Sequence, residues 1–414
     1  MIQWQELIKW GAQQAASDVF FKPTARPAMR LKGEVHIIDD WPILEPQDTI
    51  DMAHELMTER EWDRFQDYHE KDVGLTVGDV CRLRINVYQE RNHIAIAMRI
   101  IPLIVKSCEE LNLPTTLQDI AMEPQGFVLV TGPTGCGKST TLAAMLDYVN
   151  KNRRGHMITV EDPIEYVHRD IKCFVSQRAI GIDTENFHDA MKFAMRQSPD
   201  IILIGEMRDI ETMQVAMQAA ETGHLVFSTI HTTSAYETME RIINMFPPHD
   251  KPQICMRLSQ SLRGVISQNL VPRAEGVGRI AALEIMRVTP TIEKMILEAR
   301  TSDMYDVIAE GQHWGMMTKN QSLIKLYTDG FITEESAMHY AGNRTEMRQM
   351  IRRHEAEASD EARRKAEEEK KRTRLRAQQQ QAAQQAAAPP AESGDGNGGQ
   401  APSQPAPTDS QPGA

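Results

Sequence analysis

A short glycine-rich loop between an apolar run and a helical pattern limits the folds open to this chain of 414 residues. Residues 126–140 read GFVLVTGPTGCGKST and contain the pattern G-x-x-x-x-G-K-[ST] at residues 132–139. The apolar residues 127–130 predict a buried strand, and the apolar spacing over residues 142–149 predicts a helix. The sequence therefore predicts a strand, a tight loop and a helix in that order.

The loop has the composition needed to hold a polyphosphate. Its glycines let backbone N–H groups point inward, and the start of the helix faces the anion. Lys138 is expected to neutralise the β- and γ-phosphates, and the hydroxyl of Ser139 to bind Mg2+. The alternative, a glycine turn before an ordinary helix, is disfavoured by the matching flanks. We expect a nucleotide to contact the whole loop, which consists of Gly132, Pro133, Thr134, Gly135, Cys136, Gly137, Lys138, Ser139 and Thr140.

Length and composition set the class of protein. The length predicts two folded domains and a tail, and 41% hydrophobic residues can bury a sizeable core. A formal net charge of -12 disfavours general nucleic-acid binding. The five cysteines are widely separated, which indicates neither a disulfide framework nor a C-x-x-C metal site and suits a reducing cytosol. With no signal-peptide pattern and no apolar window of about 18 residues, we expect neither secretion nor a membrane span.

The segment before the loop predicts a small α+β domain. A helix is expected over residues 2–15, one or two helices over 46–65 and a pair of strands over 81–101, with further short strands at 19–21, 28–31 and 34–38. Prolines and polar positions mark residues 102–118 as a linker.

After the linker, four apolar runs alternate with helical segments, and each run ends at a polar residue. The runs are 127–131, 157–160, 201–205 and 225–230, and residues 279–286 form a further strand candidate. This pattern predicts a parallel sheet covered on both faces, with ligands at the carboxyl ends of the strands. We expect Lys138, Glu161, Glu165, Glu206 and His231 at that edge.

The acids at this edge suit hydrolysis. Phosphoryl transfer needs a carboxylate on the metal and a second group that orients or deprotonates the attacking water. The strand-end acids are Glu161, Asp162, Glu165 and Glu206, and the last of them follows a glycine rather than the apolar run itself. A solvated loop carboxylate is the alternative for any single acid, and their shared edge disfavours it.

For the histidines and for the arginines before the loop, the sequence allows both a structural and a functional interpretation. His224 and His231 flank one strand at a spacing that suits no compact metal pair, so a hydrogen-bonding role and a nucleotide or subunit contact both stay open. Arg82, Arg84 and Arg99 precede the loop in their own domain, and a neighbouring subunit could supply them to a shared site. Exposed strand charges are the alternative. Cys136 is interpreted as a small filler, and the 24 methionines as core filling.

Four motifs together resemble the type IV pilus retraction ATPases, PilT and PilU, of the secretion ATPase superfamily, over about residues 1–350. They are GPTGCGKST at 132–140, ITVEDPIE at 158–165, DIILIGEMRD at 200–209 and TGHLVFSTIHTT at 222–233. The resemblance implies a PAS-like N-terminal domain, a RecA-like ATPase domain and a homohexameric ring with nucleotide between subunits.

The resemblance also implies roles for single residues. Glu165 is expected to polarise the attacking water, and Glu206 to act on Mg2+ as the Walker B acid. His231 is expected to link the nucleotide state to the subunit interface. Arg84 and Arg99 match positions that contact the nucleotide of the neighbouring subunit.

The sequence departs from the retraction ATPases in two places. Residues 291–298 read TIEKMILE, whereas the PilT type has a motif close to AIRNLIRE, so both arginines are lost. Residues 340–348 are more similar to the end of PilU, while the glycine loop is more similar to PilT. The choice between the two subfamilies stays open.

We therefore predict a cytoplasmic hexameric motor that hydrolyses ATP with Mg2+ to drive pilus retraction and twitching motility. It would be peripheral to the inner membrane, through a platform protein of the pilus machinery, with a paralogous retraction ATPase as a further candidate partner and no direct nucleic-acid binding. The alternatives are an accessory PilU-like subunit and, less favoured, a nucleic-acid translocase. The expected segments are a PAS-like domain at 1–101, the linker at 102–118, the ATPase domain at 119–290, a helical subdomain at 291–353, and a tail at 354–414 that begins as a frayed charged helix and becomes disordered.

Overall fold

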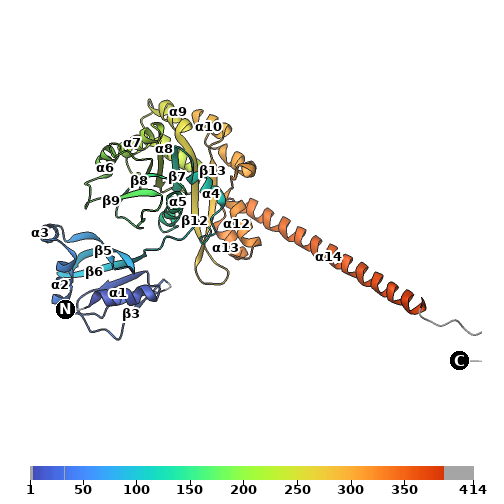
Figure 1. The fold of residues 1–414 in the computed structure, drawn as a ribbon, viewed down its shortest axis with the longest axis horizontal. Helices are drawn as coiled ribbons and strands as arrows, with labels where there is room; N and C mark the ends of the chain where they lie inside the picture. Colours follow the sequence, from blue (N-terminus) through green and yellow to red (C-terminus); the bar gives the residue numbers. More distant parts are fainter. Residues whose placement is uncertain (1–2, 32, 387–414) are drawn as a thin grey trace, which may run out of the picture. The chain divides into compact units, whose positions relative to one another are not determined.

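The structure is a computed structural model that describes residues 3–31 and 33–386. It divides into two compact units, residues 1–351 and residues 352–414. The first unit contains two β-sheets (Figure 1). In the part of the chain that the structure describes, none of the helices combines the length and the apolar character needed to cross a membrane.

The N-terminal sheet has six strands in the order β3-β2-β1-β6-β5-β4, and all neighbouring strands are antiparallel. Side chains on β5 alternate between the core and a half-buried face, as expected for a sheet covered on one side. The predicted α+β fold is confirmed. Strand β4 was not predicted, because its sequence is partly exposed and begins with three charged residues. The elements are α1 (Trp4–Gln13), β1 (Asp18–Phe21), β2 (Ala28–Leu31), β3 (Glu34–Ile37), α2 (Pro46–Leu56), α3 (Glu59–Tyr68), β4 (Glu70–Val77), β5 (Cys81–Glu90) and β6 (His93–Pro102).

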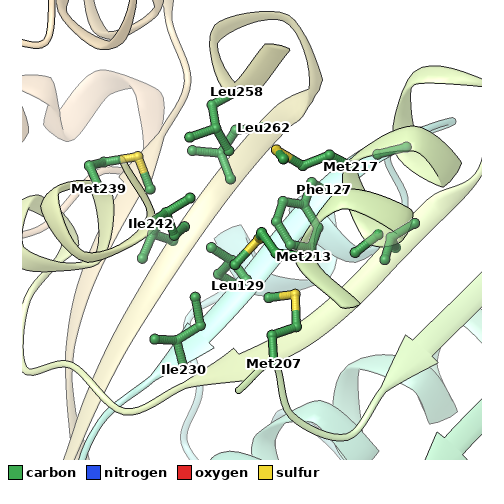
Figure 2. Packing of buried hydrophobic residues seen from close by; sticks show 14 of the residues in the cluster. Phe127, Leu129, Met207, Met213, Met217, Ile230, Met239, Ile242, Leu258 and Leu262 are labelled. Atoms are coloured by element: carbon green, nitrogen blue, oxygen red, sulfur yellow. The ribbon is translucent and has the colours of Figure 1, made fainter. Parts of the chain in front are cut away.

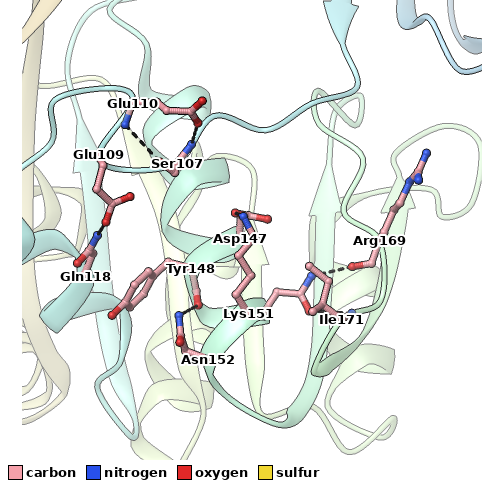
Figure 3. A network of polar contacts seen from close by, with 11 residues as sticks. Ser107, Glu109, Glu110, Gln118, Asp147, Tyr148, Lys151, Asn152, Arg169 and Ile171 are labelled. Atoms are coloured by element: carbon pink, nitrogen blue, oxygen red, sulfur yellow. Dashed lines mark hydrogen bonds and ion pairs between the residues drawn. The ribbon is translucent and has the colours of Figure 1, made fainter.

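The predicted linker is ordered in the structure. Ser107 and Glu110 exchange hydrogen bonds between side chain and backbone, with N–O distances of 2.7 and 3.2 Å. The Gln118 side chain donates to Glu109, which fixes this turn against α4 (Thr115–Ala121) (Figure 3).

The second sheet has seven strands in the order β13-β12-β7-β11-β10-β8-β9. All neighbouring strands are parallel except β12 and β13. Its elements are β7 (Gly126–Thr131), α5 (Lys138–Asn152), β8 (Gly155–Glu161), β9 (Cys173–Ala179), α6 (Phe187–Ala194), β10 (Ile201–Ile204), α7 (Ile210–Glu221), β11 (Leu225–Ile230), α8 (Ala235–Met245), α9 (Lys251–Ser261), β12 (Leu262–Pro272) and β13 (Arg279–Arg287). The four predicted runs are strands β7, β8, β10 and β11, whereas β9 and β12 were not predicted.

Helices cover both faces of this sheet, as the uninterrupted apolar runs predicted. Phe127 and Leu129 of β7 face one layer, where they pack with methionines of α7 and α8 (Figure 2). Val128 and Val130 face the opposite layer, with Leu146 of α5. The RecA-like α/β class is therefore confirmed.

Beyond β13 the chain is helical, as predicted, with α10 (Pro290–Leu297), α11 (Met304–Glu310), the short helix η1 (Gly311–Trp314), α12 (Lys319–Thr328), α13 (Glu334–Tyr340) and α14 (Arg344–Ala386). Helix α14 has 43 residues and includes the charged part of the tail, for which a helix was predicted. Ion pairs one turn apart, such as Arg353 with Glu357 at 2.9 Å, support it. The predicted disorder after α14 concerns residues outside those described. The domain boundaries listed above stay a prediction.

Candidate functional site

The glycine loop takes a shape that only glycine permits. Gly132 has φ +143°, and a Cβ there would lie 2.4 Å from the carbonyl oxygen of Gln268. Gly137 has φ +89° at the N-cap of α5, and a Cβ would lie 2.9 Å from Nε2 of Gln268. Both the backbone conformation and the close approach of β12 therefore require glycine. The loop ends at the start of α5, where backbone N–H groups favour an anion.

Gln268 is a site residue that the sequence analysis missed. Its Nε2 donates to the Cys136 carbonyl oxygen at 2.7 Å, and its Oε1 accepts from the Thr141 hydroxyl at 2.7 Å. The neighbouring Ser267 hydroxyl lies 2.8 Å from that of Thr131. All of these groups belong to buried residues, so β12 stabilises the loop through buried hydrogen bonds. Two polar residues in the middle of an apolar segment were the available signal.

Three further loop residues, Lys138, Cys136 and Thr140, are held by local contacts or by burial. The Lys138 ammonium donates to the carbonyl oxygens of Gly132 and Pro133 at 2.9 and 3.1 Å, which holds it over the loop. Cys136 is buried, and burial raises the pKa of its thiol, which fits the filler role and not that of a nucleophile. The Thr140 hydroxyl lies 2.9 Å from that of Tyr166, which links the loop helix to the acidic motif.

The acidic motif, residues 158–165, spans the end of β8 and the turn after it, and its Glu161 is a buried carboxylate. Glu161 is 8% exposed, and it accepts hydrogen bonds from the Thr159 hydroxyl at 2.7 Å, the Gln177 amide at 3.2 Å and the backbone N–H of Glu165 at 3.3 Å. Burial raises the pKa of Glu161, while these hydrogen bonds oppose the shift. Glu165 is half-buried. Glu161 therefore shapes the turn, and Glu165 is the more accessible acid.

Glu206 and His231 emerge from adjacent strands and meet. The Glu206 carboxylate pairs with Arg208, and its Oε2 lies 3.7 Å from Nε2 of His231. A Cβ on Gly205 would lie 3.3 Å from the Glu161 backbone, which explains why a glycine separates this acid from its strand. His224, at the other end of β11, bonds through Nδ1 to the Ala219 carbonyl oxygen at 2.9 Å, which supports its structural interpretation.

His231 lies close enough to three charged side chains for them to shift its pKa. Burial lowers the pKa of His231, Lys138 and Arg241 lower it further, and Glu206 opposes them. The strands β7, β11, β10 and β8 are consecutive in the sheet, and their carboxyl ends carry the glycine loop, His231, Glu206 and the acidic motif in that order. The hydroxyl of Ser139 and the carboxylate of Glu206 are hard oxygen donors of the kind that suits Mg2+.

The arginines of the N-terminal sheet point away from its core; Arg82 and Arg84 are half-buried and Arg99 is exposed. Arg84 and Arg99 are directly opposite each other on β5 and β6. Arg99 forms an ion pair with Asp18 at 3.1 Å. Arg82 has a partner within its own chain, because its Nε donates to the carbonyl oxygen of Ile164 in the acidic motif at 3.0 Å. The interpretation of Arg82 as a residue supplied to a neighbour is therefore not supported.

Comparisons with known proteins agree with this geometry. The profile of the type II/IV secretion system proteins matches residues 5–389. The type IV pilus retraction ATPase PilT of Pseudomonas aeruginosa is 43% identical over 336 residues, which cover 81% of this chain and 97% of that protein. The type IV pilus ATPase PilU of the same organism is 37% identical over 351 residues, covering 85% of this chain and 92% of that protein.

A solved structure of the pilus retraction motor PilT with bound ADP superposes with a TM-score of 0.79 at 39% identity, covering 84% of this chain and all of that chain. The profile match spans most of the sequence, and the identity with PilT extends over most of both chains. The resemblance seen in the four sequence motifs is confirmed, and the chain belongs to the family of type II/IV secretion system proteins.

Proposed function

We propose that this protein is a ring-forming motor ATPase that drives type IV pilus retraction and twitching motility. One observation carries the proposal. The glycine loop with Lys138, the pair formed by Glu206 and His231, and the acidic motif with Glu165 occupy the carboxyl ends of four consecutive strands. The extended identity with the retraction ATPase PilT supports the direction of the motor.

The residues divide the work of hydrolysis. Lys138 neutralises charge on the β- and γ-phosphates, and the loop N–H groups hold the phosphate oxygens. Glu165 polarises the attacking water, and Tyr166 holds the adjacent backbone against the loop helix. Ser139 and Glu206 would hold Mg2+, which would supply electrophilic stabilisation of the phosphate oxygens. His231 contacts Glu206, and through this contact it transmits changes in the bound nucleotide to the loop before α8.

Paired lysine variants test the site. Lys138→Ala should lower kcat by at least about a hundredfold, because it removes the main cation over the phosphates. Lys151→Ala on the same helix, where the side chain is 50% exposed and pairs with Asp147, should leave kcat unchanged. Glu206→Gln should also lower kcat, and binding of Mg2+ with nucleotide should weaken. Full activity of Lys138→Ala would contradict the proposed site.

We further propose that the site lies between subunits of a homohexamer and that Arg84 and Arg99 serve the neighbouring nucleotide. Their direct opposition across two strands places two guanidinium groups together on a face that is not the core. If the site is shared, a ring that mixes Lys138→Ala subunits with subunits lacking both arginines regains activity. On random 1:1 mixing, about a quarter of the interfaces then combine an intact loop with intact arginines. Mixed rings as inactive as each parent would refute the shared site.

An accessory role is the second candidate. The identity with the pilus ATPase PilU covers as much of the chain as that with PilT, and residues 291–298 lack the two arginines of the PilT motif. An accessory subunit would hydrolyse ATP slowly alone and faster with a paralogous retraction ATPase. Turnover measured alone and in the mixture separates the two roles.

The proposed motor acts in the cytoplasm at the inner membrane, through a platform protein of the pilus machinery. Deletion of the gene should give hyperpiliated cells that do not retract their pili. Normal retraction in the deletion strain would leave only the accessory role.

A further inference from the structure

Two residues that have no role in the proposed hydrolysis form hydrogen bonds to the loop that carries His231 and to the start of the next helix, and they connect this loop to the C-terminal helices. The loop, residues 231–234, runs from the end of β11 to the N-cap of α8. Glu284 approaches it from β13, and Lys319 approaches it from the first turn of α12.

Glu284 is a buried carboxylate, 4% exposed, at the start of α8. Its Oε1 accepts the backbone N–H of Ala235 at 2.7 Å. Burial raises the pKa of Glu284, whereas backbone hydrogen bonds from Ala235 and Lys319 and the charge of Lys319 lower it. This carboxylate therefore accepts the first backbone N–H of α8 and interacts electrostatically with Lys319, the first residue of α12.

Lys319 adds a direct contact to the loop. Its ammonium donates to the carbonyl oxygen of Thr233 at 3.0 Å. Strand β13 and the segment before α12 are also joined, because Ile285 and Met317 exchange two backbone hydrogen bonds of 2.8 and 3.0 Å. The start of α12 is thus bonded both to the loop and to β13.

The next residue of α12 faces the C-terminal helices. Asn320 is 1% exposed, and its Nδ2 donates to Glu346 of α14 at 2.7 Å and to the Asn343 carbonyl oxygen at 2.9 Å. The Tyr305 hydroxyl of α11 donates to the same Glu346 carboxylate at 2.6 Å. Two adjacent residues of α12 therefore join the His231 loop to α11 and α14.

We infer that Glu284 and Lys319 are positioning residues that fix the His231 loop and couple its position to the C-terminal helical subdomain. The inference rests on the proposed function for its consequence in catalysis. Since His231 contacts Glu206, a displacement of that pair moves the Thr233 carbonyl, and Lys319 transmits the movement to α12. The C-terminal helical subdomain then moves in response to changes at the nucleotide site, in addition to packing against the sheet.

Lysine substitutions on one helix test this role. Lys319→Met keeps the length of the side chain and removes its donor, and it should lower kcat roughly fivefold while the KM for ATP changes little. Lys325→Met alters an exposed lysine on the same helix and should leave kcat unchanged. Lys319→Arg should restore part of the loss. In a His231→Ala background, Lys319→Met should add no further loss, since both act through one loop.

Amide hydrogen exchange tests the position of the loop without relying on hydrolysis. Peptides covering residues 232–238 should exchange faster in Lys319→Met than in Lys325→Met, and Glu284→Leu, which removes the acceptor, should expose the N–H of Ala235 further. Unchanged exchange, or independent losses of kcat in the double variant, would overturn the inference. If the parent protein hydrolysed no ATP and the exchange still changed, the proposed function would fail and the positioning role would stand.

Discussion

Acid should destabilise the nucleotide-binding fold through His168, which lies three residues after Glu165. Its backbone N–H donates to Oε1 of Gln177 at 2.8 Å. Burial of the ring lowers the pKa of His168 from 6.5 to about 4, and the nearby carboxylate of Asp147 only partly opposes this shift. The folded protein therefore binds the imidazole proton more weakly than the unfolded chain does.

The pKa difference fixes both the sign and the size of the effect. Above pH 6.5, His168 is neutral in both states, so its contribution to stability is complete. As the pH falls from 6.5 towards 4, the unfolded chain takes up the proton first and unfolding becomes easier. At about pH 5.5 the loss is about 1.4 kcal/mol at most, because the residue keeps part of its surface in water.

Urea unfolding followed by far-UV circular dichroism, at pH 7.5 and pH 5.5, measures this loss as a difference between variants. His168→Gln should lose less stability than the parent over this interval, by up to about 1.4 kcal/mol, because it cannot titrate. His249→Gln, which alters a side chain that is 80% exposed, should behave like the parent. An equal loss in His168→Gln and in the parent would refute the reasoning.

Three further substitutions have expected outcomes. Gly132→Ala should abolish nucleotide binding in a fluorescence titration while the circular dichroism spectrum is retained, since its Cβ would lie 2.4 Å from a backbone oxygen; binding at the parental affinity would be contrary evidence. Gln268→Ala should weaken binding roughly fivefold by calorimetry, because the buried carbonyl of Cys136 loses its donor. Asn150→Ala should cost about 2–3 kcal/mol of unfolding free energy, because three backbone partners lose their hydrogen bonds, whereas Asn152→Ala on the exposed face should cost under about 0.5 kcal/mol.

The sequence predicted the parts of the fold that depend on local pattern. The glycine loop, its strand and its helix are adjacent in the chain, and each run of residues in β7, β8, β10 and β11 is apolar because helices cover both faces of the sheet. Since parallel strands share a carboxyl edge, strand order was not needed to bring Glu206 and His231 together. The sequence predicted that these two side chains lie near each other, but not that their atoms are 3.7 Å apart.

The missed elements share a physical cause. Strand β12 begins directly after α9 without a turn, and Ser267 and Gln268 interrupt its apolar pattern because they bond to Thr131 of β7 and to the carbonyl oxygen of Cys136. Strand β9 is an edge strand with mostly half-buried residues, so its composition resembles that of a loop. In both cases tertiary contacts, with β7 and β8, determine the strand, and no window of sequence contains them.

The arginines of the N-terminal sheet provide a physical argument for the proposed sharing of the site between subunits. Arg84 and Arg99 are directly opposite on antiparallel strands, and like charges in that relation destabilise a sheet. Asp18 pairs with Arg99 at 3.1 Å and with Arg30 at 3.4 Å, so this carboxylate balances only one of three guanidinium charges. A polyphosphate on an adjacent subunit would relieve the repulsion that an isolated chain retains. The local excess of positive charge is therefore a physical argument for the proposed shared site. Motifs within one sequence identify the loop and the acids, whereas the nucleotide that Arg84 and Arg99 would contact belongs to another subunit.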